Sequence, residues 1–316
     1  MKKNTYIIEE IEDFLPAHVF ECGQCFRWNR QPDGSFTGIA SGRVVSVRFE
    51  PEPEREPGRT LEQTSRQTRL RNFESDLQKA FCEEAQPQRR GRLVIDNCTE
   101  EDYRQFWCQY LDLKRNYKEI KESLKQDDPV MARAIEFGWG IRILNQDLWE
   151  TIVSFIISQN NNIPRIKGCI ENLAVLCGEK IPGETCGGRQ WYNLPDPQRL
   201  ARMSVSDLAP AKLGYRAKYL IETAKTVCEK GLPSDQEELA RLCGVGPKVC
   251  SCIALFGMGL MDSFPVDVWV ARVMNRLYGL DEKDRAGISD FAKEKFGGLG
   301  GFAQQYLFYY MRENSR

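Results

Sequence analysis

The sequence is poor in histidine, and this scarcity limits the chemistry that it can perform. One histidine, His18, occurs among the 316 residues. That count excludes a histidine-rich metal site and argues against a Ser-His-Asp triad. No run approaches the ~18 consecutive apolar residues of a membrane-spanning helix, and the opening residues lack the apolar core of a secretory signal. We therefore expect a protein with no membrane partner, whose catalysis, if any, uses Lys, Asp, Glu, Cys or Ser.

A surplus of positive charge is also missing. The formal net charge is −1 and the pI is about 6.1. The charge of the whole chain therefore gives no support for nucleic-acid binding, although a local basic face can still provide it.

Cysteine is plentiful, yet its spacing indicates neither a disulfide scaffold nor a zinc site. The chain has 12 cysteines, and disulfide scaffolds are normally much smaller, secreted proteins. Cys22 and Cys25 form a CxxC pair, but no second such pair completes a zinc ribbon. We expect reduced thiols in a cytoplasmic protein (nucleoid-associated if bacterial), with no metal and no cofactor.

Two parts of the chain differ in pattern. Residues 1–49 are rich in β-branched and aromatic residues with turn signals between them, and this predicts strands over 23–29, 35–40 and 42–50. Residues 50–91 are polar and proline-spaced, and they predict a long solvated loop or insertion; a contact arm for DNA or a partner is the alternative. Another strand and a helix start follow over 91–102. The expected fold is α+β: an N-terminal antiparallel sheet domain over 1–115, then an all-helical domain over 116–316.

Helical periodicity dominates from about residue 103 onward. Apolar residues recur with the helical period in segments separated by short Gly or Pro loops. The pattern predicts helices over 103–113, 128–139, 147–158, 163–177, 206–211, 215–231, 235–243, 247–259, 265–279 and 289–313.

The most informative stretch lies between two of these helices. Gly244-Val245-Gly246 precedes Pro247, which suits the first position of a helix, where its missing N–H is not needed. A Gly-x-Gly turn between two helices is typical of a helix-hairpin-helix, whose outward backbone N–H groups can bind a nucleic-acid phosphate without reading sequence. Residues 242–248 alone leave open the alternative of an ordinary helix–helix turn.

Two charged residues add a chemical possibility. Lys248 falls in the first turn of the second helix, where the helix dipole disfavours a cation, so we expect it to be partly neutral and nucleophilic; an exposed lysine tolerated in water is the alternative. Asp267 follows Pro265 at the start of the next helix. It can serve as an ordinary N-cap, as half of an ion pair, or as a catalytic carboxylate opposite Lys248.

These residues resemble the helix-hairpin-helix DNA glycosylases with a Gly/Pro-Asp loop, and the chain is similar to one branch of them, the 8-oxoguanine DNA glycosylase/AP lyases. The resemblance runs in order from about residue 8 to 310, apart from 50–91. Its strings lie at 21–28, 140–166, 213–219, 242–249, 264–270 and 302–308.

The resemblance implies a pocket for a flipped base. A lesion inside a duplex must be extruded before chemistry can reach it. The backbone carbonyl of Gly23 would accept the N7–H that distinguishes 8-oxoguanine from guanine. Phe308 and Cys252 would stack on the two faces of the base, and Gln304 would bond its Watson–Crick edge.

The resemblance also implies a duplex partner, double-stranded DNA containing 8-oxoguanine, bound by a monomer. Asn160 would fill the gap, Tyr215 would wedge beside the orphan base, and Arg165 and Arg216 would grip cytosine. The hairpin residues Gly244, Val245 and Gly246 would bind phosphate.

Lys248 would attack C1′ and form a Schiff base that permits β-elimination, assisted by Asp267. One departure is Trp269, which stands where some family members carry a phosphate-contacting histidine. A second is the absence of any cysteine after Cys252, so the resemblance implies no iron–sulfur cluster. The alternatives are a glycosylase of the same superfamily with another lesion specificity, and a non-catalytic DNA-binding module.

Overall fold

The computed structural model describes residues 4–52, 89–182 and 189–314. Most of the predicted insertion at 50–91 lies outside these residues. The described N-terminal strands form one five-stranded antiparallel sheet in the order β1-β5-β4-β3-β2. Their bounds are β1 (Thr5–Glu12), β2 (Trp28–Arg30), β3 (Phe36–Ala40), β4 (Arg43–Pro51) and β5 (Arg90–Asp96). This sheet followed by helices confirms the predicted α+β class; the boundary near residue 115 stays a prediction.

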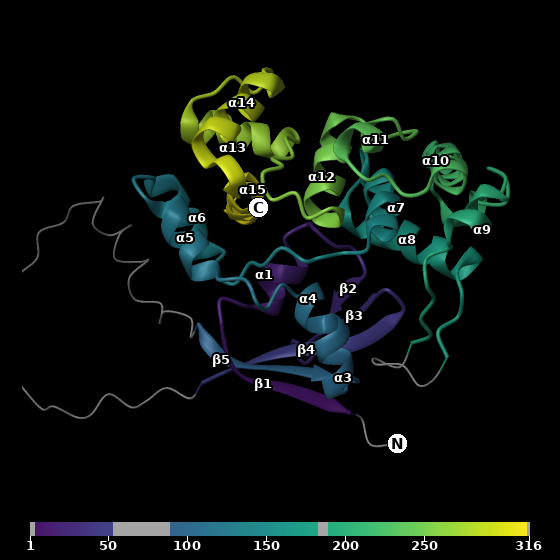
Figure 1. The fold of residues 1–316 in the computed structure, drawn as a ribbon, viewed down its shortest axis with the longest axis horizontal. Coiled ribbons are helices and arrows are strands. Elements are labelled where there is room, and N and C mark those ends of the chain that lie inside the picture. Colours follow the sequence, from purple (N-terminus) through teal and green to yellow (C-terminus); the bar gives the residue numbers. More distant parts are fainter. Residues whose placement is uncertain (1–3, 53–88, 183–188, 315–316) are drawn as a thin grey trace, which may run out of the picture.

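Helices account for most of the remaining described residues, and most of them lie above the sheet in Figure 1. The short helix α1 (Pro16–Phe20) precedes β2. After the sheet come α3 (Glu100–Asp102), the π-turn η1 (Tyr103–Trp107), α4 (Cys108–Tyr110), α5 (Tyr117–Lys125), α6 (Pro129–Phe137), α7 (Leu148–Ser158), α8 (Ile163–Cys177) and α9 (Pro197–Ala201). The chain continues with η3 (Ala209–Ala211), α10 (Arg216–Lys230), α11 (Gln236–Ala240), α12 (Pro247–Gly257), α13 (Val268–Tyr278), α14 (Arg285–Phe296), η4 (Gly297–Leu299) and α15 (Gly300–Asn314).

Several predicted elements need correction. Of the strand predicted over 23–29, β2 includes only Trp28 and Asn29, because Gly23 has φ +87° and a loop precedes Trp28. The helix predicted over 206–211 is a single 3-10 turn, and 289–313 is divided between α14 and α15 at the glycines of η4. Strand β1 and helices α1, α5 and α9 were not predicted.

Two main apolar cores support these layers. The sheet packs on α1 and α4 around fully buried aromatic side chains that include Phe20, Trp28 and Trp107, and the Phe20 and Trp28 rings stack at 3.9 Å. A larger core runs through the helices from Tyr117 to Met311. Cys22 and Phe26, which lie between α1 and β2 in sequence, belong to this second core. The N-terminal segment is therefore anchored in the helical part of the molecule.

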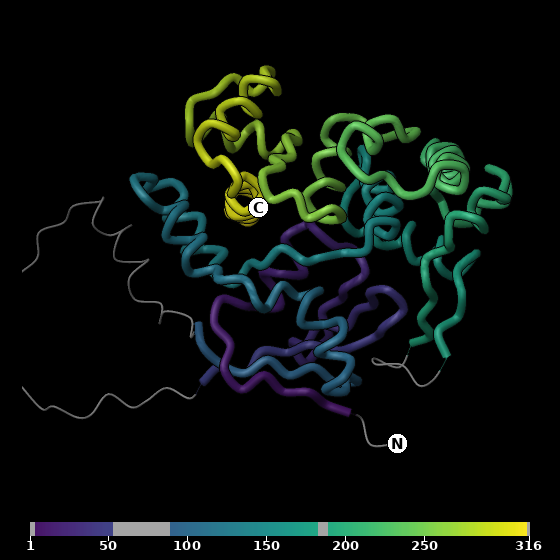
Figure 2. The backbone as a smooth tube through the Cα atoms, viewed as in Figure 1, coloured from purple at the N-terminus to yellow at the C-terminus, as the bar shows by residue number. Residues whose placement is uncertain are grey.

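The loop that follows α1 lies beside the C-terminal helix α15. In Figure 2 the purple segment that follows α1 passes near the yellow end of α15. The Arg312 guanidinium on α15 donates a hydrogen bond to the backbone carbonyl of Glu21. The loop that carries Gly23 is thus tied directly to the helix that carries Phe308.

Candidate active site

The hairpin predicted from Gly244-Val245-Gly246 is present between α11 and α12. Gly244 has φ +81°, and a Cβ on it would lie 2.5 Å from the ring of Tyr219, so the turn requires glycine for both conformation and space. Gly246 is the N-cap of α12 and has no side chain with which to cap it. The first N–H groups of α12 therefore remain suited to an anion such as a phosphate.

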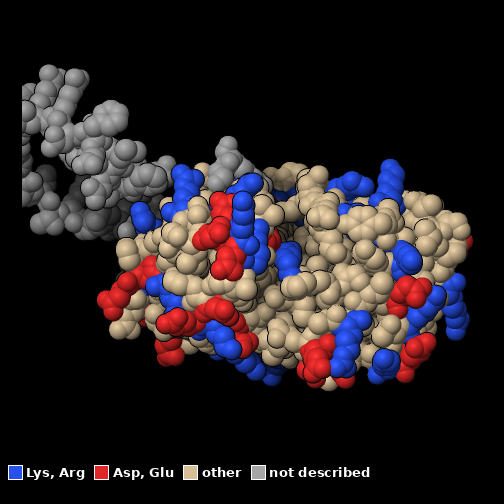
Figure 3. All heavy atoms as spheres, turned by 90° about the horizontal axis from the view of Figure 1, so that it is seen from above, with Lys and Arg blue, Asp and Glu red and all other residues tan. Residues whose placement is uncertain are grey.

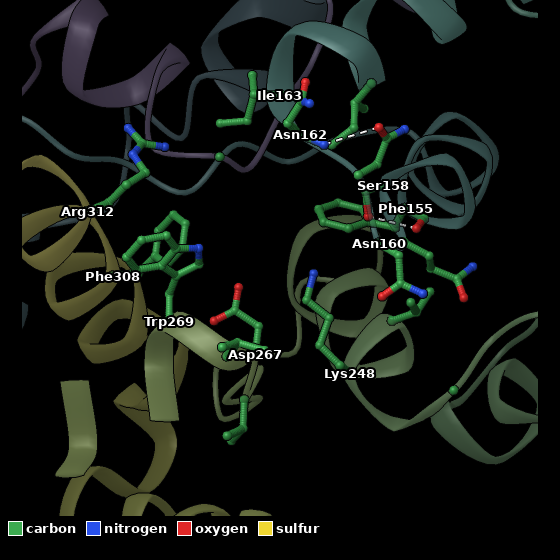
Figure 4. A pocket seen from close by; sticks show the side chains of 18 of the residues that line it. Phe155, Ser158, Asn160, Asn162, Ile163, Lys248, Asp267, Trp269, Phe308 and Arg312 are labelled. Atoms are coloured by element: carbon green, nitrogen blue, oxygen red, sulfur yellow. Dashed lines mark hydrogen bonds between the residues drawn. The ribbon is translucent and has the colours of Figure 1, made fainter. Parts of the chain in front are cut away.

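Pro247 begins α12 and Lys248 follows in its first turn, as predicted. Asp267 is the N-cap of α13, where its carboxylate accepts a hydrogen bond of 2.7 Å from the N–H of Val270. Figure 4 shows the Lys248 amine and the Asp267 carboxylate facing one another across an open space. Asp267 therefore both caps α13 and faces Lys248, so these two roles, which the sequence left as alternatives, are compatible.

The space between them is part of a cavity of about 750 Å³. Its wall combines the start of α12, the start of α13, the loop between α7 and α8, and α15. Of the residues predicted for the site, six line it: Gly23, Asn160, Gly246, Lys248, Asp267 and Phe308. The structure thus assembles residues that are far apart in sequence around one hollow of nucleobase-compatible size.

The charge on Lys248 differs from the expectation. Burial alone lowers the pKa of this amine, but the Cys252 sulfur one turn later and the Asp267 carboxylate raise it, and the result lies above the ordinary lysine value. The amine also lies 5.6 Å from the ring centroid of Phe155, a position that favours a cation. The raised pKa favours a protonated Lys248 over a partly neutral one in this DNA-free structure.

Cys252 and Gln304 are close to the site but do not line the cavity among the described residues. Cys252 is 4% exposed, and burial raises the pKa of its thiol. Gln304 is 5% exposed, and its Oε1 accepts a 3.2 Å hydrogen bond from Gln305. Their contact with a base stays a prediction.

Gly23 is positioned by a side chain that the sequence did not single out. Gln24 is fully buried and donates from Nε2 to the carbonyls of Val19 (2.8 Å) and Arg142 (2.7 Å). Its Oε1 accepts the N–H of Leu144 at 2.9 Å. These bonds fix the loop around Gly23 to the stretch that leads into α7. Because Arg142 and Leu144 are more than a hundred residues away from Gln24, no local sequence signal marks this role.

Of the predicted DNA-contacting residues of this region, Asn160 lines the cavity, whereas Tyr215 and Arg216 lie beside it. Asn160 is exposed with φ +46°, and its Nδ2 lies 3.4 Å from the hydroxyl of Tyr215, which is 49% exposed. Arg216 is only 4% exposed, and its guanidinium donates to the carbonyls of Gln159 and Asn160. Arg216 therefore orders the loop of Asn160 from within, a role that the sequence did not indicate.

The remaining predicted arginine is differently placed. Arg165 is exposed in the first turn of α8, and its backbone N–H is capped by the side chain of Asn162. Its guanidinium is available for a partner outside the chain. Val245, by contrast, is 7% exposed and packs in the helical core, so a contact with phosphate would involve its backbone.

Trp269 and Arg285 complete the rim beside Asp267. Trp269 lines the cavity and is 41% exposed, with the Arg272 guanidinium 5.4 Å from its ring. Arg285 donates a 2.5 Å hydrogen bond to the backbone carbonyl of Asp267. Some members of the family that the sequence resembles carry a phosphate-contacting histidine at this position. Here Trp269 presents an aromatic surface instead.

Surface charge is mixed on the face shown in Figure 3, where Lys and Arg are interspersed with Asp and Glu. Within the described ranges, no group of three or more His, Cys, Asp or Glu side chains is arranged to hold a metal ion. Among these residues no helix is both long and apolar enough to cross a membrane.

Comparison with known proteins decides the family. The 8-oxoguanine DNA glycosylase N-terminal domain family matches residues 6–152, and the HhH-GPD superfamily of base excision DNA repair proteins matches residues 153–296. A probable N-glycosylase/DNA lyase of Methanothermobacter thermautotrophicus is 30% identical over 233 residues, which is 64% of this chain and 73% of that protein. The chain belongs to the 8-oxoguanine DNA glycosylase/lyase family.

Solved structures agree with this membership. The 8-oxoguanine glycosylase/lyase of Clostridium acetobutylicum, in complex with double-stranded DNA containing cytosine opposite 8-oxoguanine, is 38% identical. It has a TM-score of 0.81 and covers 100% of this chain and 97% of its own. MBOgg1, in complex with a low-affinity DNA ligand, is 40% identical with a TM-score of 0.80 and full coverage of both chains. This member of the family is therefore a base-excision DNA glycosylase and DNA lyase.

Proposed function

We propose that this glycosylase/lyase excises 8-oxoguanine from duplex DNA opposite cytosine and then cleaves the strand with Lys248 as the nucleophile. The observation that carries the proposal is the facing pair of Lys248 and Asp267 in a cavity that Gly23 and Phe308 also line. A buried duplex base is inaccessible, so the lesion is rotated into this cavity.

Lesion selection follows from one hydrogen-bond donor. In 8-oxoguanine N7 carries a hydrogen, whereas in guanine N7 is an acceptor. The carbonyl of Gly23 accepts this N7–H, and the ring of Phe308 stacks on the base. Cys252 stacks on its second face, and Gln304 bonds its Watson–Crick edge. In undamaged guanine, N7 is an acceptor and would face the Gly23 carbonyl, which is also an acceptor. The hydrogen bond would then be lost, and the Gly23 carbonyl would be desolvated without a partner.

The catalytic step begins with transfer of a proton from the Lys248 ammonium to the Asp267 carboxylate, which passes it on to the departing base. The neutral amine attacks C1′, the C1′–N9 bond breaks, and the base departs with the electron pair and is protonated. Opening of the sugar then gives an iminium ion between C1′ and Nζ. Removal of a C2′ proton expels the 3′ phosphate by β-elimination. The Asp267 carboxylate stabilises positive charge on the sugar and assists the proton transfers.

The orphan cytosine supplies the opposite-base preference. Its O2 and N3 are acceptors, so they complement the exposed guanidinium of Arg165, and that of Arg216 once it exchanges the carbonyls of Gln159 and Asn160 for the cytosine. Asn160 fills the vacated space and Tyr215 kinks the duplex. The N–H groups of Gly244, Val245 and Gly246 and of the start of α12 hold a phosphate. A monomer in the cytoplasm, nucleoid-associated in a bacterial source, is the state that we expect.

A substrate panel tests this proposal. Duplexes that contain 8-oxoguanine, 3-methyladenine or undamaged guanine, each opposite cytosine, are incubated with enzyme in excess. We expect excision of 8-oxoguanine at least about 10²-fold faster than of either other base, because only this base offers the N7–H. Equal excision of another lesion would favour a different specificity within the superfamily. Binding without excision or strand cleavage would indicate a non-catalytic module.

A further inference from the structure

A buried arginine in the cavity wall has one donor that the fold does not use. Arg312 is 8% exposed. Its Nη2 donates to the carbonyl of Glu21, and its Nε donates to the carboxylate of Glu313 at 2.9 Å. Its Nη1 is buried and has no hydrogen-bond partner among the residues that the structure describes. A buried guanidinium donor without a partner is unusual because its desolvation is not compensated.

The unused donor lies next to the residues proposed to hold the base. Arg312 lines the cavity, and its guanidinium carbon is 5.4 Å from the centroid of the Phe308 ring. A Cβ built on Gly23 would lie 3.7 Å from Arg312 Nη1. A ligand that reaches the carbonyl of Gly23 and stacks on Phe308 therefore comes within reach of this nitrogen.

The direction in which a bound nucleotide must lie decides which atom meets the donor. Lys248 and Arg312 stand at opposite sides of the cavity in Figure 4. The sugar C1′ has to be next to Lys248 for attack. In 8-oxoguanine, O8 is attached to C8, which neighbours the glycosidic nitrogen, so O8 points back toward the sugar. O6 lies on the other side of N7 and points away from the sugar, toward Arg312.

We propose that Arg312 Nη1 donates a hydrogen bond to O6 of the flipped lesion, so that Arg312 is a further base-specificity residue. This inference rests on the proposed function and deepens it. Gly23 then accepts from N7–H while Arg312 donates to the adjacent oxygen. This pairing rejects 8-oxoadenine, whose N7 also carries a hydrogen but whose 6-amino group offers hydrogens where Arg312 needs an acceptor.

Binding without turnover provides the test. In a Lys248→Gln background, affinities are measured for three duplexes with cytosine opposite the central site: 8-oxoguanine, 8-oxoadenine, and a tetrahydrofuran abasic analogue that has no base. Arg312→Met removes the donors and keeps an apolar stem. Glu313→Gln is the matched control, because it removes the neighbouring charge and keeps the guanidinium. Thermal unfolding checks each variant, and Arg312→Leu, which also lacks the donors, replaces the Met variant if the latter does not fold.

We expect Arg312→Met to weaken binding of the 8-oxoguanine duplex by about tenfold or more, and of the abasic duplex by less than about twofold. The preference for 8-oxoguanine over 8-oxoadenine should fall by about the same tenfold factor, whereas Glu313→Gln should retain it. Equal losses on all three duplexes, or on both oxidised purines, would overturn the contact with O6. A Lys248→Gln parent with no preference for 8-oxoguanine over guanine would instead overturn the proposed function, and this contact with it.

Discussion

The turn of the hairpin should be unusually intolerant of a single methyl group at Gly244. This residue has φ +81°, and a Cβ on it would lie 2.5, 2.6 and 2.8 Å from Cδ2, Cγ and Cβ of Tyr219. Those atoms are at the base of the ring and cannot move without moving α10. The Tyr219 ring also packs edge-on against Tyr215 at 5.5 Å, so a shift would be transmitted to the proposed wedge.

The magnitude follows from two separate penalties. A left-handed backbone costs a non-glycine residue about 1–2 kcal/mol. Overpacking against a rigid neighbour adds about 1–3 kcal/mol. Gly259 provides the matched control because its φ is +72° and nothing lies within 4 Å of a Cβ built there. Gly244→Ala should therefore lower the free energy of unfolding by about 2–5 kcal/mol, and Gly259→Ala by about 1–2 kcal/mol.

Urea unfolding of both variants gives the comparison, provided that the m-value is unchanged. A third measurement introduces Gly244→Ala into a Tyr219→Ala background, where the contacts with Cδ2 and Cγ are gone and the penalty should be smaller, leaving the backbone cost and the 2.8 Å contact with Cβ. Equal destabilisation by Gly244→Ala and Gly259→Ala would refute the collision with Tyr219, and so would an unchanged penalty in the Tyr219→Ala background.

Three other predictions address chemistry and pH. Asp267→Asn should keep the cap to the Val270 N–H and hence the stability, whereas Asp267→Ala should lose about 1 kcal/mol in urea unfolding. Both variants should slow single-turnover excision by about 10²-fold or more. Full activity of the Asn variant would exclude a catalytic carboxylate. Arg165→Ala should reduce the preference for excision opposite cytosine by about tenfold, and unchanged ratios across the four opposite bases would contradict its role. Burial lowers the pKa of His18 to about 4, while its Nδ1 accepts the Gly140 N–H. The unfolded chain binds this proton from about pH 6.5 downward, so wild-type stability should fall by up to about 3 kcal/mol between pH 6.5 and 4 relative to His18→Asn. Parallel pH profiles of the two proteins would disprove that linkage.

The features that the sequence predicted well are those with local causes. Gly244, Pro247 and Asp267 each act within one turn of their own helix, so their roles as turn, first helical residue and N-cap follow from short-range rules. The α+β division likewise follows from a change of hydrophobic period along the chain.

The features that it missed depend on distant partners. The bonds from Gln24 to Arg142 and Leu144, and from Arg312 to Glu21, join segments separated by more than a hundred residues. The pKa of Lys248 also differs from the expectation, because Cys252, one turn later, and the carboxylate of Asp267, which the fold brings opposite, both raise it. Pattern alone could not weigh these two effects.

Borohydride trapping tests the central claim most directly. The enzyme is incubated with a duplex containing one 8-oxoguanine opposite cytosine, and with an identical duplex containing guanine, in the presence of borohydride. Our account predicts a covalent protein–DNA adduct on the lesion duplex alone, with the modified peptide containing Lys248, and no adduct from Lys248→Gln. Excision of 8-oxoguanine without any trapped adduct, or strand cleavage by Lys248→Gln at the wild-type rate, would contradict it.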